Sequence, residues 1–144
     1  MLRNFAVVVL GLFVGMLVNM VVVQINMALF PFPPEVDVND PVALGRAIAT
    51  MPAAAWPLVF VAHLGQSFVG AWVAARLATR KPHRLALAVG PLSLAAGIAN
   101  AVMLSLPAWT WIEMPLYLLV AWFAGKLAGK PRAEAEQTSA TDDA

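Results

Sequence analysis

The sequence has no cysteine and little charge. Only 12% of its 144 residues are charged, whereas 61% are hydrophobic, and the mean hydropathy is +0.78. The lack of cysteine excludes disulfides, thiolate metal sites and cysteine nucleophiles. Because there is no basic face or aromatic–basic motif, we expect no nucleic-acid partner. This composition is far from that of soluble proteins, and it predicts an integral membrane protein with a single domain.

Long apolar stretches predict an all-α, polytopic membrane fold. A hydrocarbon core about 30 Å thick is crossed by roughly 20 apolar residues in a helix. The chain offers four such stretches, at about residues 5–29, 54–79, 84–106 and 109–129. We therefore expect one four-helix transmembrane domain over residues 1–132. The remainder, 133–144, is acidic and polar without large apolar residues, which predicts a disordered tail.

The basic residues predict the orientation of these helices. Eight of the nine lysines and arginines fall on one side if the four helices alternate in direction: Arg3, Arg76, Arg80, Lys81, Arg84, Lys126, Lys130 and Arg132. The positive-inside rule makes that side cytoplasmic. We therefore expect a multi-pass membrane protein with both termini in the cytoplasm. A basic residue before the first stretch also fits a signal peptide, but the apolar run is longer than a signal core.

The segment 31–53 between the first two spans is then expected outside the membrane. Asp40 and Pro41 are typical of a helix start, with aspartate as the N-cap and proline at the first helical position. Leu44, Ile48 and Met51 follow at helical spacing. They predict a short interfacial helix that lies against the outer surface of the membrane.

Two stretches fifty residues apart resemble each other. Ala71–Arg80 and Ala121–Lys130 share five of ten residues, and their basic residues fall in the same register. The same register sets His63 opposite Glu113. One interpretation is a parallel duplication of a helix hairpin, as occurs in transporter folds. The alternative is that small residues and interfacial cations recur without any duplication.

Polar residues within the spans lie mainly in their outer halves. Because buried polar groups in lipid need partners, these residues predict an outward-facing polar cavity. The candidates for ligand or proton binding are His63, Glu113, Gln66, Ser67, Asn19 and Asn100. For the amides and serine, hydrogen bonding between helices alone is an alternative. For Glu113 the alternative is a capping box over residues 110–113.

Other motifs predict packing or weak cation binding. Small-xxx-small spacing allows helix backbones to approach closely, and it favours a homo-oligomer or a membrane-protein partner in the lipid bilayer. The residues concerned are Gly11, Gly15, Gly70, Gly125 and Gly129. The outer carboxylates Glu35, Asp37 and Asp40 offer oxygen ligands to a cation. They lack the spacing of a calcium loop, which favours a solvated cap instead.

Motifs of known catalytic sites are scarce. The chain has no Gly-x-Ser-x-Gly, no His-Glu-x-x-His and no phosphate-binding loop. The sequence therefore favours small-ligand or ion binding, or transport, through the outward cavity. An accessory or assembly subunit of a larger membrane complex is the alternative, and an intramembrane enzyme comes last. The sequence identifies neither a cofactor nor a metal.

Several short motifs carry a resemblance to a known group of proteins. They are Asn39-Asp40-Pro41, Pro52, Gly70-Ala71 with Ala74-Ala75-Arg76, and Gly97-Ile98-Ala99-Asn100. In these the chain resembles small four-helix bacterial inner-membrane proteins of an uncharacterised family, over most of residues 5–129. The resemblance implies a polytopic bacterial membrane protein and transfers no catalytic residue.

Overall fold

The computed structural model describes the backbone of residues 2–142 and the side chains of residues 2–108 and 110–128. Within these residues the chain is all-helical, as expected, and contains no strand. Its α-helices are α1 (Leu2–Leu29), α2 (Pro41–Ala49), α3 (Trp56–Leu77), α4 (Pro82–Met103) and α5 (Met114–Asp142). Short 3₁₀ helices precede α3 at Ala53–Ala55 and α5 at Ala108–Glu113.

Three helical segments are long and apolar enough to cross a membrane. They are Leu2–Leu29, Ala53–Leu77 and Pro82–Met103. The membrane class predicted from composition agrees with these three segments. The fourth predicted stretch, 109–129, differs in its start, because the chain forms a 3₁₀ helix after Pro107 and α5 begins only at Met114.

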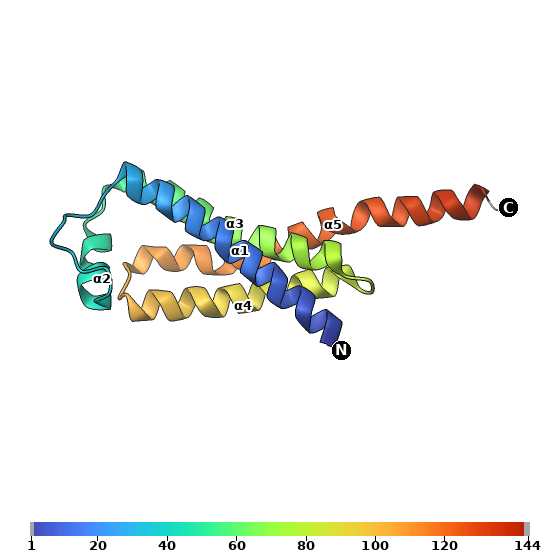
Figure 1. Ribbon diagram of the computed structural model, residues 1–144, viewed down its shortest axis with the longest axis horizontal. Coiled ribbons are helices and arrows are strands. Elements are labelled where there is room, and N and C mark those ends of the chain that lie inside the picture. Colours follow the sequence, from blue (N-terminus) through green and yellow to red (C-terminus); the bar gives the residue numbers. More distant parts are fainter. Residues whose placement is uncertain (1, 143–144) are drawn as a thin grey trace.

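Helix α3 lies at the centre of the bundle. It packs against α1, α4 and α5. In Figure 1, α4 and α5 run side by side, and both chain termini lie at the end opposite α2. We call the end that holds the termini and the basic residues around the α3–α4 loop (Arg76, Arg80, Lys81 and Arg84) the basic end, and the opposite end the α2 end.

Alanine dominates the core of the bundle at the basic end. Small side chains let helix backbones approach closely, which is the usual way in which helices pack in lipid. The core comprises Ala71, Ala74, Ala75, Ala86, Val89, Ala121, Ala124 and Ala128.

The glycines predicted to mediate packing do so within the chain. Gly11 lies against the backbone oxygen of Gly70, and Gly15 lies against the backbone oxygen of Gln66, so these contacts join α1 to α3. A Cβ atom added at Gly125 would lie 2.8 Å from that of Ala86, which joins α5 to α4. The side-chain surroundings of Gly129 are outside the described residues. Gly11 and Gly15 are therefore already covered, and they do not form an open face for a second copy.

The segment before α3 begins as predicted. Asp40 caps α2 by accepting a hydrogen bond of 2.9 Å from the backbone nitrogen of Val42, and Pro41 occupies the first turn. Gly45 then lies against the backbone oxygen of Leu104, just past the end of α4. Helix α2 thus packs across the end of the bundle (Figure 1), where Leu44 and Ile48 line a cavity and Val42 is exposed.

The end of the chain differs from the expectation. We predicted a disordered tail over 133–144, whereas the backbone of α5 continues as helix to Asp142. Alanine and glutamate, which are frequent after Arg132, are good helix formers and explain the continuation. Residues 143–144 are outside the described residues.

Candidate functional site

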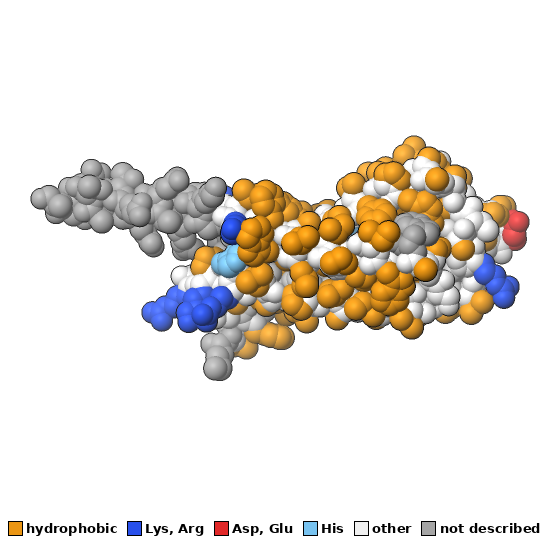
Figure 2. Space-filling view, turned by 180° about the vertical axis from the view of Figure 1, so that it is seen from behind, with side chains coloured by type: hydrophobic (Ala, Val, Ile, Leu, Met, Phe, Trp, Pro, Cys, Tyr) orange, Lys and Arg blue, Asp and Glu red, His pale blue; other side chains and the backbone are white. Residues whose placement is uncertain are grey.

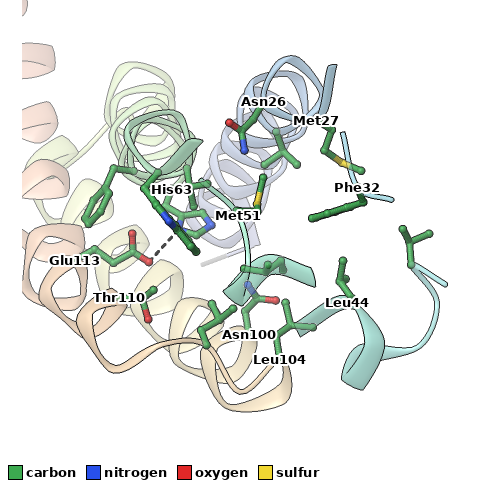
Figure 3. Close-up of a pocket in the computed structure, with 17 residues that line it drawn as sticks. Asn26, Met27, Phe32, Leu44, Met51, His63, Asn100, Leu104, Thr110 and Glu113 are labelled. Carbon is green, nitrogen blue, oxygen red and sulfur yellow. Dashed lines mark hydrogen bonds and ion pairs between the residues drawn. The ribbon is translucent and has the colours of Figure 1, made fainter. Parts of the chain in front are cut away.

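A cavity of about 400 Å³ lies at the α2 end of the bundle. Its walls come from α1, α2, α3 and α4, from the loop after α1, and from the 3₁₀ helix before α5 (Figure 3). Twelve of its seventeen lining residues are apolar: Val23, Met27, Phe32, Val38, Leu44, Ile48, Met51, Trp56, Val59, Phe60, Leu104 and Leu106.

The lining departs from the polar cavity that we predicted. The sequence indicates which polar side chains lie at the level of the cavity. It does not show which apolar side chains the loop after α1 and helix α2 place among them. Only five lining residues are polar, namely Asn26, His63, Asn100, Thr110 and Glu113. The cavity is therefore an apolar chamber with a few polar groups, the usual character of a small-molecule site.

His63 and Glu113 meet in the wall of this cavity. The Nδ1 atom of His63 lies 2.9 Å from Oε1 of Glu113, and the two side chains point toward each other in Figure 3. Glu113 is only 3% exposed, and His63 is half-buried. The structure thus joins the two ionisable side chains that the fifty-residue register set opposite each other.

The capping box proposed for residues 110–113 is wrong. The Oγ1 atom of Thr110 donates to the backbone oxygen of Pro107 at 2.8 Å, and α5 begins after Glu113 instead of around it. The carboxylate of Glu113 therefore turns across to α3. The 3₁₀ conformation after Pro107 is the reason, because it moves the helix start beyond the predicted cap.

A second contact repeats the fifty-residue register. Ser67 Oγ donates to the backbone oxygen of Tyr117 at 3.0 Å, one turn further along α3 and α5. Both hydrogen bonds join residues i and i+50, so these helices run side by side with matched depth. Tyr117, which the sequence did not single out, packs against Gly97 on α4. A Cβ atom added at Gly97 would lie 3.0 Å from the tyrosine hydroxyl.

The same register extends to the basic end. The guanidinium of Arg76 lies 5.2 Å from the ring centre of Trp72 on α3. The ammonium of Lys126 lies 3.8 Å from the ring centre of Trp122 on α5. Each pair is a cation–π contact between residues four apart on an exposed helix face.

Some of the predicted polar residues pair away from the cavity. Asn19 Nδ2 donates to the side-chain oxygen of Gln66 and so joins α1 to α3. Neither of these residues lines the cavity, nor does Ser67. For Asn19, Gln66 and Ser67 the observed contacts are those of the alternative, hydrogen bonding between helices. Asn100 does line the cavity, together with His63 and Glu113.

Asn26 contributes an unusual group to the same cavity. Its side chain is only 4% exposed, and its Oδ1 atom has no hydrogen-bond partner within the described part of the chain. A buried amide oxygen without a partner costs on the order of 1–3 kcal/mol. The position carried a signal in the sequence, because Asn26 follows Asn19 by two helical turns and shares its face.

The acidic segment takes part in local structure. Asp37 Oδ1 accepts hydrogen bonds from the backbone and the side-chain nitrogen of Asn39, at 2.9 and 3.3 Å, and Asp40 caps α2. Glu35 is exposed. Across the described residues, no three or more histidine or acidic side chains come together in a way that could hold a metal ion.

Comparison with known proteins found no relative. No protein-family model matches the chain, and neither a curated protein nor a solved structure matches it. The functional argument therefore depends on the cavity and on the His63–Glu113 contact.

Proposed function

We propose that this chain is a small-ligand binding or transport protein of the bacterial inner membrane, built as a bundle of four membrane-spanning helices. The proposal takes α5 as the fourth span, because it packs against α3 and α4, two of the three apolar segments, and is uncharged from Met114 to Gly125. The lysines and arginines that Figure 2 displays gather mainly at one end of the molecule. The positive-inside rule makes that end cytoplasmic, together with both termini.

A parallel duplication of a helix hairpin accounts for the symmetry within the bundle. Under this proposal α1 and α3 correspond to α4 and α5. Two observations support it. Two hydrogen bonds join residues that are fifty positions apart, and a cation–π pair on α3 recurs fifty residues later on α5.

The proposed ligand site is the cavity at the α2 end. One observation carries the proposal: a buried carboxylate and its histidine partner line a mainly apolar chamber of about 400 Å³. Apolar walls supply binding energy, and a few polar groups orient the ligand. In membrane-spanning regions ionisable residues are costly, and their presence points to function.

The proposal is tested by filling the cavity. The protein is placed in lipid nanodiscs, and binding of naphthylmethanol, a small aromatic alcohol, is measured by equilibrium dialysis against empty nanodiscs. Val59→Trp fills the chamber from α3, and it should weaken binding by at least about tenfold, or 1.4 kcal/mol. Val61→Trp is the matched control, because Val61 is exposed on the same helix and does not line the cavity.

A second filling variant, Ile48→Trp on α2, covers the case in which Val59→Trp does not fold. Equal binding to the wild type and to both cavity variants contradicts the proposal. If naphthylmethanol and its amine and carboxylate analogues all fail to bind the wild type, the ligand-binding proposal is wrong. That outcome favours the alternative, an accessory subunit of a larger membrane complex.

A further inference from the structure

We infer that the ligand of this cavity is a lipophilic amine, a small apolar molecule with one cationic N–H group. The inference depends on the proposed ligand-binding function and specifies its substrate class. It follows from three features of the cavity: the polar groups in its wall, the aromatic and sulfur side chains around them, and the charge of the segment beside it.

The polar side chains in the wall include two buried groups with acceptor oxygens. Glu113 supplies a buried carboxylate, and Asn26 supplies a buried oxygen without a partner. No lysine or arginine is found among the described residues that line the chamber, so His63 is the one basic group there. A ligand with N–H donors would satisfy the Asn26 oxygen and add a hydrogen bond to the Glu113 carboxylate. Hydrogen bonds to an ionised group are about twice as strong as neutral ones.

The remaining wall suits a cation with an apolar body. Trp56, Phe60 and Phe32 line the chamber, and aromatic faces attract cations by about 0.5–2 kcal/mol, most strongly where water is excluded. Met27 and Met51 add polarisable sulfur that adapts to irregular shapes (Figure 3). Apolar walls alone would accept any hydrophobic molecule, so they set the body of the ligand and not its charge.

The segment beside the cavity adds charge of the matching sign. Phe32 and Val38, in the segment before α2, line the chamber. This segment carries three exposed carboxylates, and α2 adds a single arginine, Arg46. These carboxylates belong to Glu35, Asp37 and Asp40. Acidic groups close to a site concentrate cations around it and repel anions. A fatty acid, by contrast, would carry a negative charge past them and toward the buried Glu113.

The test compares three ligands with the same aromatic body: naphthylmethylamine, naphthylmethanol and naphthoate. Binding to the protein in nanodiscs is measured by equilibrium dialysis, with empty nanodiscs and Val59→Trp to subtract partitioning into lipid. We expect the amine to bind at least about tenfold more tightly than the alcohol, and naphthoate to bind most weakly. Glu113→Gln keeps the shape of the side chain and should bring the ratio of amine to alcohol affinity close to one.

The outcomes separate this inference from the proposed function. If the alcohol or naphthoate binds the wild type as tightly as the amine, the amine inference is wrong and ligand binding stands. If all three fail to bind, the proposed function fails. An unchanged amine-to-alcohol ratio in folded Glu113→Gln also overturns the inference. Should that variant not fold, the order of the three ligands on the wild type still decides.

Discussion

Glu113 is an ionisable residue that the bundle buries almost completely. It faces an apolar chamber, and its hydrogen bond to His63 spans from the 3₁₀ helix to α3. A buried charge with one partner removed is costly, whereas removal of both partners costs less than the sum. The pair therefore couples the two halves of the chain at the α2 end.

This coupling is measurable with a double-mutant cycle on His63→Ala and Glu113→Ala. Each single variant should lower the free energy of unfolding in detergent. The double variant should lose less than the sum, with an interaction of about 1–2 kcal/mol. Unfolding is followed by circular dichroism. Strict additivity would mean that the 2.9 Å contact contributes no stability.

Close approach of α1 to α3 depends on glycine at specific positions. A Cβ atom at Gly15 would collide with the backbone oxygen of Gln66, whereas one at Gly65 meets only a side-chain carbon of Val18 at 3.8 Å. The first neighbour is backbone and cannot move without shifting a helix. The second contact is an ordinary van der Waals distance.

Gly15→Ala and Gly65→Ala therefore form a matched pair. The first should lower stability by about 1–3 kcal/mol through overpacking. The second should be neutral or raise stability by up to about 1 kcal/mol, because alanine favours helix. Thermal unfolding in the same detergent compares them. Equal stability of the two variants would contradict the close contact between α1 and α3.

Helix α2 closes one side of the cavity, and its start depends on Asp40. Asp40→Ala removes the hydrogen bond to Val42 and should destabilise α2 by about 1 kcal/mol. Amide hydrogen exchange over residues 41–49 should accelerate several-fold. Glu35→Ala removes a carboxylate from the same segment without touching the cap, so exchange in α2 should stay as in the wild type. Equal acceleration in both variants would indicate that charge, and not the cap, holds α2.

The arrangement of the whole molecule in the membrane is open to direct labelling, because the chain contains no cysteine. Single cysteines at Glu35 and Arg84 lie in exposed positions near opposite ends of the bundle. In intact cells an impermeant maleimide should label Glu35→Cys and spare Arg84→Cys, and in inverted vesicles the pattern should reverse. The expectation follows from the positive-inside rule. Labelling of both from one side would overturn the orientation.

Local pattern alone accounts for much of the fold. Long apolar stretches, the Asp40–Pro41 start of α2 and the fifty-residue register can all be read without tertiary contacts, since composition and helical periodicity determine them. Because α3 and α5 run parallel, residues fifty positions apart, such as His63 and Glu113, lie at the same depth. The helix-forming residues after Arg132 were also visible, although polarity led to the opposite prediction for the tail.

Only the tertiary structure decided which side chains meet. The rotation and tilt of each helix bring Asn19 to Gln66, turn Asn26 and Asn100 to the cavity, and cover Gly11 and Gly15 within the chain. They also make the cavity mainly apolar, because the loop and α2 fold over it. The apolar pattern of a helix in lipid does not specify its rotation, since lipid-facing and core-facing residues are equally hydrophobic, and packing between distant segments must set it.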